Sequence, residues 1–259
     1  MRITDQTWSQ GDGVDYEDIS NQVGNFAWVL DGATALVKKE GSVYTPRWLV
    51  EQADKILAAG AKRSTSIQEI SEYYRQNFNP GNEYQFLMPE EKRSFAMALL
   101  NVNHFHLEYM CFADCSIILK QQDNITLLQD EKWAARNKGG PPKEFFAQPK
   151  EQQIQSDIIG RRKMNTPEGY WIGTADGEGF RHAAINKRTI TDPDTEIIIC
   201  SDGFERAISF GLYEWSDIFQ HKLDEITNQL RKVENHDIDL KQYPRGKKSD
   251  DIAAIRLVL

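Results

Sequence analysis

Short runs of apolar residues alternate with polar segments along the chain, and each run has roughly the length of one β-strand. Two runs are continuously apolar, which is typical of strands covered on both faces. They are Phe26–Leu30 and Ile197–Cys200. A longer run, Phe95–Val102, is apolar except for Asn101. Further runs occur at His104–Phe112, Ser116–Leu119, Ile125–Leu128, Tyr170–Ile172 and Ile252–Leu259. The runs between Phe95 and Leu128 are too close together for crossover connections, so we expect antiparallel hairpins there.

Helical spacing appears between these strands. One face of a helix that begins after Pro46 is formed by Leu49, Val50, Ala53, Ile56 and Leu57. A capping box, Ser66-x-x-Glu69, predicts the start of a second helix, and a third is expected over Ile218–Leu230. The stretch Gly173–Gly179 lacks the Gly-Lys-Ser/Thr ending of a phosphate-binding loop, so we interpret it as a hairpin.

The order of strand, helices, meander, strand, helix and strand predicts an α+β fold in which helices flank the sheets. No internal repeat or shift in composition marks a boundary, so we expect a single domain over residues 1–259. Residues 130–168 differ from their surroundings because they are polar and contain Gly139–Pro142. A long connection of this kind is usually functional or mobile, and we interpret it as a flap-like insertion.

Charge and cysteine content narrow the class of function. The chain has 31 basic and 39 acidic residues, a formal charge of −8, which disfavours binding to a nucleic-acid backbone. No apolar run approaches the roughly 18 residues of a membrane helix, and the first residues lack a signal-peptide pattern. Cys111, Cys115 and Cys200 lie in or beside apolar runs, as buried small hydrophobic residues do. We therefore expect a cytoplasmic protein with reduced thiols, and the sequence does not indicate its oligomeric state.

Acidic residues stand at the ends of several apolar strands. Asp31 directly follows one strand, Asp202 nearly follows another, and Asp250 precedes the last. An Asp-Gly pair usually marks a hairpin turn. Neither Asp31-Gly32 nor Asp202-Gly203 is followed by an alternating strand, however, so the turn interpretation is disfavoured at both. Strand ends on a rigid sheet are positions where ligands can be held accurately.

Carboxylates that meet at one point repel one another, so their negative charge must be neutralised. Two such charges 4 Å apart repel by about 4 kcal/mol at an effective dielectric constant near 20. The cluster must therefore keep protons or bind a cation. Oxygen donors without histidine or cysteine favour Mg²⁺ or Mn²⁺ over zinc. Two such ions about 3.5–4 Å apart can share and deprotonate one water, which gives a nucleophile for attack on phosphorus.

Four segments, in this order and at suitable spacing, resemble signatures of the PPM-type (type 2C) metal-dependent protein phosphatases. They are Tyr16–Asp18, Val29–Thr34, Cys200–Phe204 and Ser249–Ile252. Ala113-Asp114-Cys115 resembles a degraded form of a fifth signature. The resemblance spans nearly the whole chain. It implies a four-layer sandwich, in which helices flank two antiparallel sheets, with two Mg²⁺ or Mn²⁺ ions at one edge.

The resemblance also implies a role for each acidic residue. By position, Asp31 would bridge both ions and Gly32 would offer its carbonyl oxygen. Glu17 would serve one ion, often through water, whereas Asp202 and Asp250 would serve the other.

Three more aspartates fall beside this set. Asp18 would orient the ligands without contacting an ion itself. Asp114 stands where a third ion would bind, and Asp251 falls where the family often has asparagine. The implied reaction is hydrolysis of phosphoserine or phosphothreonine in a protein substrate by metal-bound water, without a covalent intermediate.

The chain departs from the family pattern at four positions. Ala33 replaces the histidine proposed as general acid, and Gly13 replaces an arginine that binds substrate phosphate. Arg206 replaces an acidic residue, and Ala113 replaces a glycine. These departures motivate an alternative, a catalytically weak pseudophosphatase that uses the fold to bind a protein partner.

The sequence does not decide which residue binds the substrate phosphate. Arg161-Arg162, in the polar insertion, could supply the missing anchor or form a solvated helix face. A small phosphorylated metabolite is a further possible substrate, and the sequence identifies neither substrate nor general acid.

Overall fold

The structure is a computed structural model that describes residues 1–33, 36, 44–138, 143–146 and 148–259. In this part of the chain, the strands form two antiparallel five-stranded sheets. The first sheet, in spatial order, contains β1 (Arg2–Ser9), β10 (Ile252–Val258), β9 (Glu196–Cys200), β6 (Ser116–Gln121) and β7 (Asn124–Leu128). The second contains β2 (Asp18–Val23), β3 (Phe26–Ala33), β4 (Ser94–Asn103), β5 (His106–Phe112) and β8 (Asn186–Thr189).

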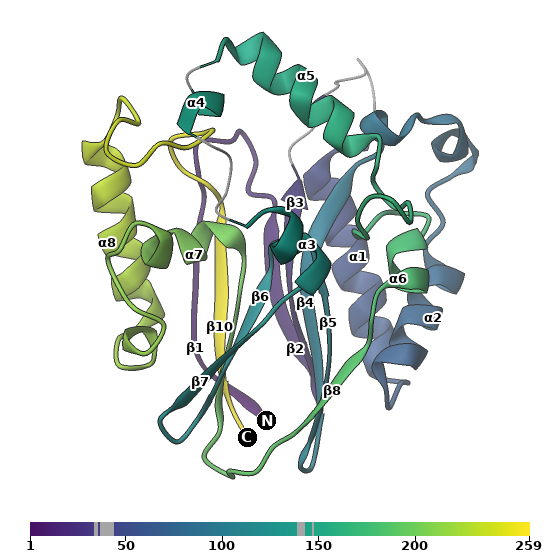
Figure 1. Ribbon diagram of the computed structural model, residues 1–259. Helices are drawn as coiled ribbons and strands as arrows, with labels where there is room; N and C mark the ends of the chain where they lie inside the picture. Colours follow the sequence, from purple (N-terminus) through teal and green to yellow (C-terminus); the bar gives the residue numbers. More distant parts are fainter. Residues whose placement is uncertain (34–35, 37–43, 139–142, 147) are drawn as a thin grey trace.

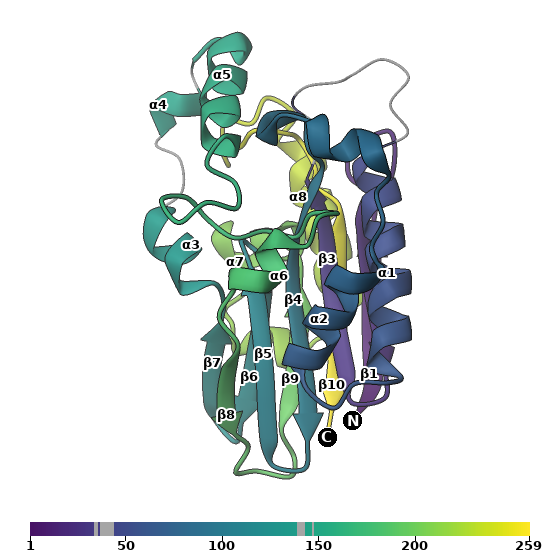
Figure 2. The ribbon, with the colours of Figure 1, turned by 90° about the vertical axis from the view of Figure 1, so that its right-hand side faces the viewer.

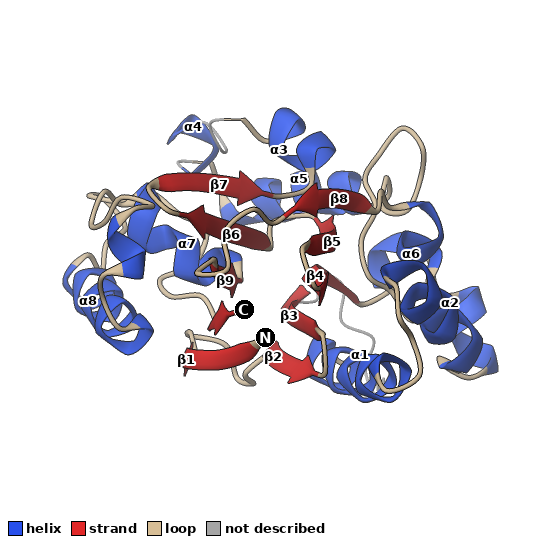
Figure 3. Cartoon of the chain, turned by 90° about the horizontal axis from the view of Figure 1, so that it is seen from below, coloured by secondary structure: helices blue, strands red, loops and turns tan. Residues whose placement is uncertain are grey.

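Helices cover the outer face of each sheet, as Figures 1 and 3 show. α1 (Pro46–Ala61) and α2 (Ile67–Asn77) pack on the second sheet, whereas α7 (Asp202–Ser209) and α8 (Leu223–His236) pack on the first. The expected α+β sandwich of two antiparallel sheets flanked by helices is therefore confirmed. None of the helices in the described part of the chain is long and apolar enough to cross a lipid bilayer.

The central strands are buried on both faces, as their continuous apolar runs predict. In β3, Val29 faces the core between the sheets, whereas Trp28 and Leu30 pack against α1 and α2. In β9, Ile199 joins the core between the sheets and Ile198 packs beneath α7 and α8. A slip of one residue would exchange these two environments, so burial on both faces fixes the register. The ends of β3 and β9 are consequently held in place.

Two predicted elements are wrong. Tyr170–Ile172 is not a strand, because the Ile172 amide donates to the Asn165 side chain (2.9 Å) and only isolated bridges form at Tyr170 and Gly173. The stretch after it is not a hairpin, because Gly177, at φ 70°, leads directly into α6 (Glu178–His182).

Helix boundaries follow local chemistry. Ser66 caps α2 by accepting a hydrogen bond from the Glu69 amide (3.3 Å), as the capping box predicts. The expected helix over Ile218–Leu230 instead begins at Leu223, since its first apolar residues lie in the separate 3₁₀ turn Asp217–Phe219. Two further 3₁₀ helices, Asn82–Phe86 and Pro89–Glu91, precede β4.

The polar segment 130–168 carries α3 (Glu131–Arg136), α4 (Lys143–Phe146) and α5 (Lys150–Arg161), and its Gly139–Pro142 lie outside the described residues. Figures 1 and 2 place α4 and α5 at the end of the sandwich opposite the chain termini. α5 is attached near both its ends, because Lys150 Nζ donates to the Gly246 carbonyl (3.2 Å) and Arg162 Nε pairs with Glu90 (2.9 Å).

Candidate functional site

The first acidic residues meet at the open end of one hairpin. β2 and β3 pair in a register that sets Asp18 opposite Asp31. One residue further, the Gly32 amide donates to the Glu17 carbonyl (3.0 Å). A Cβ on Gly32 would lie 2.7 Å from that oxygen, so only glycine allows this approach. The Asp-Gly pair at the end of β3 thus brings Glu17 beside Asp31.

The second group comes from two strands of the other sheet. Asp202 begins α7 directly after β9, and Asp250 precedes β10, which pairs with β9. Glycines hold the backbone of residues 250–251 on two sides. A Cβ on Gly203 would lie 1.9 Å from the Asp251 carbonyl oxygen, and a Cβ on Gly11 would lie 2.6 Å from the Asp250 carbonyl carbon. The backbone that carries Asp250 is therefore tightly enclosed.

Asp251 ties the amino-terminal segment to this backbone. Its carboxylate accepts hydrogen bonds from the Gly11 amide (2.7 Å) and from the Glu17 amide (2.5 Å). The Asp12 carboxylate adds bonds from the backbone amides of Lys248 and Ser249. Asp251 thereby positions Glu17 through its backbone.

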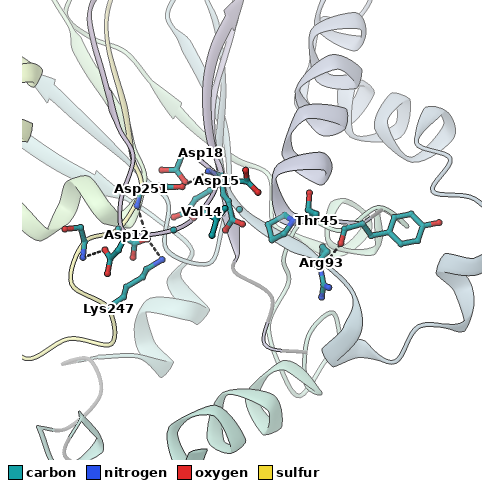
Figure 4. A pocket seen from close by; sticks show the side chains of 16 residues that line it. Asp12, Val14, Asp15, Asp18, Thr45, Arg93, Lys247 and Asp251 are labelled. Atoms are coloured by element: carbon teal, nitrogen blue, oxygen red, sulfur yellow. Dashed lines mark hydrogen bonds and ion pairs between the residues drawn. The ribbon is translucent and has the colours of Figure 1, made fainter. Parts of the chain in front are cut away.

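All eight predicted site residues line one or both of two adjoining cavities. The larger cavity, about 450 Å³, is lined by Glu17, Asp18, Asp31, Gly32, Asp250 and Asp251, among others. The other, about 390 Å³, lies beneath α5 and includes Asp31, Gly32, Asp114, Asp202 and Asp250. In Figure 4, Asp18, Asp251 and Lys247 lie on one side of the larger cavity, and Thr45 and Arg93 lie on the other. The structure therefore brings together the residues that the sequence singled out.

Burial and mutual repulsion shift the titration of these aspartates. Burial raises the pKa of Asp31 well above its ordinary value, and the charges of Asp18 and Asp202 raise it further. Burial, followed by the charge of Asp202, raises the pKa of Asp114 to about 7. Near neutral pH and without a cation, the cluster therefore keeps protons.

Asp18 is the most confined member of the cluster. Burial raises its pKa well above the ordinary value, which the Ser201 hydroxyl only partly offsets. No described residue donates a well-aligned hydrogen bond to either of its carboxylate oxygens. Buried polar atoms in this state usually have a ligand, ion or water as partner.

Two basic side chains that the sequence analysis missed contact the cluster. Arg206 Nη2 pairs with Asp250 Oδ2 (2.6 Å), and Lys247 Nζ pairs with Asp250 Oδ1. The sequence marks Arg206 only as a departure from the acidic residue of the family pattern. No signal marks Lys247, because its position depends on the bonds that Asp12 makes to the adjacent backbone.

Glu205 also belongs to this neighbourhood. Burial raises its pKa to about 8, and a hydrogen bond with the Ser116 side chain only partly offsets that rise. It follows Asp202 within the same helix, so its proximity could have been read from the sequence once a helix was expected after Gly203.

The chemistry of the donors fits hard divalent cations. Carboxylate and carbonyl oxygens are the ligands that Mg²⁺ and Mn²⁺ prefer, and such an ion would offset the repulsion among the aspartates, Asp18 included. Within the described ranges, however, no group of three or more His, Cys, Asp or Glu side chains is already arranged around a common ion position. Asp250 in particular has both carboxylate oxygens engaged by basic side chains.

The two arginines of the insertion differ in placement. Arg161 lines the cavity beneath α5 together with Asp31 and Asp114. Arg162 points elsewhere, because it pairs with Glu90 and its side chain is 61% exposed. The anchor hypothesis therefore applies to Arg161, whereas Arg162 holds the end of α5.

Comparisons with known proteins identify the fold. No protein-family model matches the sequence, and no curated protein matches it either. Solved structures match over nearly the whole chain. MsPP from Mycobacterium smegmatis, a PPM Ser-Thr phosphatase in complex with cacodylate, is 13% identical with a TM-score of 0.56 and covers 100% of both chains. Stp1 from Staphylococcus aureus, a serine/threonine phosphatase, is 11% identical with a TM-score of 0.58 and covers 100% of this chain and 96% of its own.

A third structure contains metal. The catalytic domain of the serine threonine protein phosphatase PstP, in complex with 2 manganese ions, is 12% identical with a TM-score of 0.55, and the match covers 97% of this chain and 95% of that one. Identity at this level establishes the fold alone. The resemblance first seen in four short segments extends over the whole described structure, and the chain has the fold of the PPM-type serine/threonine phosphatases.

Proposed function

We propose that this chain is a phosphatase that hydrolyses phosphoserine or phosphothreonine in proteins with the help of two Mg²⁺ or Mn²⁺ ions. The observation that carries the proposal is the meeting of aspartates from separate strand ends between two cavities, in a fold that MsPP, Stp1 and PstP share. The manganese ions of PstP support the same requirement here.

The proposal assigns roles to residues of this chain. Glu17, Asp31 and the Gly32 carbonyl would hold one ion, and Asp31 would share the other with Asp202 and Asp250. When bound, two such ions lower the pKa of a shared water and thereby supply a nucleophile. Asp251 and Asp18 would orient these ligands without contacting an ion themselves.

Substrate orientation would fall to basic residues of the cavities. Arg161 lines the cavity that also contains Asp31, and a guanidinium group can bind two phosphate oxygens at once. Ala33 carries no acidic group for the leaving alkoxide. An aryl phosphate, whose leaving group needs little protonation, is therefore the best first substrate.

The test is phosphate release from an aryl phosphate and from a panel of phosphopeptides and phosphometabolites with Mn²⁺ or Mg²⁺. Asp31→Asn and Asp202→Asn should each lower kcat by at least about a hundredfold, a loss typical of removing an electrostatic contact in the transition state. Asp239→Asn, at an aspartate whose side chain is 70% exposed, is the matched control. Activity that persists in EDTA, or that survives both substitutions, would contradict the proposal.

The second candidate is a pseudophosphatase that binds a protein partner. It is favoured by the ion pairs of Asp250 with Arg206 and Lys247, together with Ala33 and Gly13 in place of the family's usual residues. Calorimetric titration with Mn²⁺ beside the same substrate panel separates the two candidates. An absence of turnover on every phosphoester would favour the pseudophosphatase, and clear turnover would exclude it.

A further inference from the structure

Asp250 is engaged by two basic side chains that differ in how firmly they are held. The Arg206 side chain is 14% exposed, and besides Asp250 it pairs with Glu234 (3.2 Å), whose side chain is fully buried. If the Arg206 side chain left Asp250, its ion pair with Glu234 would still hold it in the site. Lys247 makes its ion pair with Asp250 from a side chain that is 47% exposed. Lys247 is therefore the partner that can withdraw into solvent.

Lys247 lies beside the buried aspartates, whose mutual repulsion a positive charge reduces. It lines both cavities, as do Asp31 and Asp250. Its ammonium group pairs with Asp250 Oδ1. The ammonium group thus offsets part of the repulsion that a divalent ion would otherwise relieve.

We propose that Lys247 is an internal competitor of the divalent ion at Asp250. The proposal rests on the metal-dependent function proposed above. An ion can bind the Asp250 carboxylate fully only when Lys247 Nζ withdraws, so the two ion positions fill at different concentrations and the position at Asp250 is the weaker. Lys247 thereby sets the metal concentration at which the site is completed.

The adjacent Lys248 offers a charge-matched control. Its backbone amide bonds to Asp12 (3.1 Å), and among the described ion pairs its ammonium group contacts none of the site carboxylates. Lys248→Gln removes the same formal charge from the same loop. Any effect of overall charge on metal affinity therefore appears in both variants, whereas competition at Asp250 is specific to Lys247.

The experiment is calorimetric Mn²⁺ titration of the full chain and of the variants Lys247→Gln, Lys247→Met, Lys247→Arg and Lys248→Gln, with thermal melting alongside. Both neutral variants at 247 should bind the weaker ion at least about tenfold more tightly, a change of about 1.4 kcal/mol. The arginine variant and Lys248→Gln should stay within about threefold of the parent chain. Without metal, the neutral variants should melt at a lower temperature, and Mn²⁺ should raise that temperature by more than in the parent.

Each outcome decides between the two proposals. A parent chain that binds one ion while Lys247→Gln binds two supports competition, as does the expected gain in affinity. Equal affinities in Lys247→Gln and Lys248→Gln would overturn competition and leave the proposed function standing. Mn²⁺ binding that depends on Lys247 without any phosphoester turnover would overturn the proposed function alone. If no variant binds Mn²⁺, both proposals fail.

Discussion

At the scale of single residues, glycines determine how closely the acidic segments approach. Gly32, Gly203 and Gly11 each stand where a Cβ would overlap backbone atoms of another segment. These contacts set the spacing between the strand ends that carry the carboxylates. The glycine next to each of these aspartates therefore determines how closely the acidic segments approach one another.

The first prediction concerns Gly203. Gly203→Ala should lower the free energy of unfolding by more than about 2 kcal/mol, because the new methyl group would push the backbone of residues 250–251 away. Urea denaturation measures this change, and Mn²⁺ titration should show weaker binding. Gly160→Ala, in α5, is the control, since among the described residues no atom beyond its own helix lies within 4 Å of where the methyl group would stand. It should gain up to about 1 kcal/mol from helix propensity. Equal stabilities in the two variants would contradict the crowding seen at Gly203.

Sequence reasoning locates the acidic residues better than the basic ones. Asp31, Asp202 and Asp250 are predictable because strand ends on a sheet are fixed by the apolar runs before or after them. Lys247 follows no such rule, since its loop takes its conformation from the distant Asp12. The bond between Arg206 and Asp250 likewise depends on the approach of α7 to residues 44 positions away.

At the scale of elements, a buried ion network joins α7, α8 and the segment before β10. Glu234 of α8, whose side chain is fully buried, accepts bonds from Arg206 of α7 (3.2 Å) and from Arg231 (2.6 Å). Arg231 in turn donates to the Asp250 carbonyl and to Ser9. One carboxylate thus orients two guanidinium groups, which between them contact both the side chain and the backbone of Asp250.

The second prediction concerns this network. Glu234→Gln should lower the free energy of unfolding by about 3–5 kcal/mol, because two largely buried arginines lose their shared counter-charge. Thermal or urea denaturation measures the change. Glu225→Gln, also in α8 but with a side chain that is 61% exposed, should change stability by less than about 0.5 kcal/mol. A small effect at Glu234 would show that the network contributes little.

The elements missed by the sequence share a physical cause. β1 (Arg2–Ser9) has no apolar run and exists because it pairs along its length with β10. β8 (Asn186–Thr189) is exposed at every position and is held by backbone pairing to β5. Strands of this kind are specified by their neighbours and carry no periodic pattern of their own. The buried strands β3, β4 and β9, by contrast, can be predicted from their runs of apolar residues.

At the scale of the whole molecule, the buried acids make stability depend on pH. Burial raises the pKa of Asp114 from 3.8 to about 7 and that of Glu205 from 4.5 to about 8. Between the ordinary and raised values, the folded chain binds more protons than the unfolded chain. The free energy of unfolding of the metal-free protein therefore falls as the pH rises from about 4 to about 8.

The third prediction is that the metal-free protein in EDTA is more stable near pH 5.5 than near pH 8, by at least about 1 kcal/mol. Urea denaturation at the two pH values measures the difference. On the proposed function, Mn²⁺ should restore much of the loss near pH 8, because an ion that binds only the folded chain stabilises it. Asp114→Asn should flatten the profile. A metal-free protein whose stability rises over this interval would contradict the raised pKa values.

The bonds of Asp251 join segments far apart in sequence, since they reach Gly11 and Glu17 across 240 and 234 positions. β1 and β10 add a ladder that pairs Arg2 with Val258. Contacts so remote in sequence cannot form until residues 251–258 have been synthesised, and topologies of this kind are slow to form. During synthesis, which proceeds from the amino end, Asp31 and Asp202 exist long before Asp250 can join them. The cavity that Asp31, Asp202 and Asp250 line together is thus incomplete until the segment before β10 has been synthesised, and a chain halted before Asp250 never completes it.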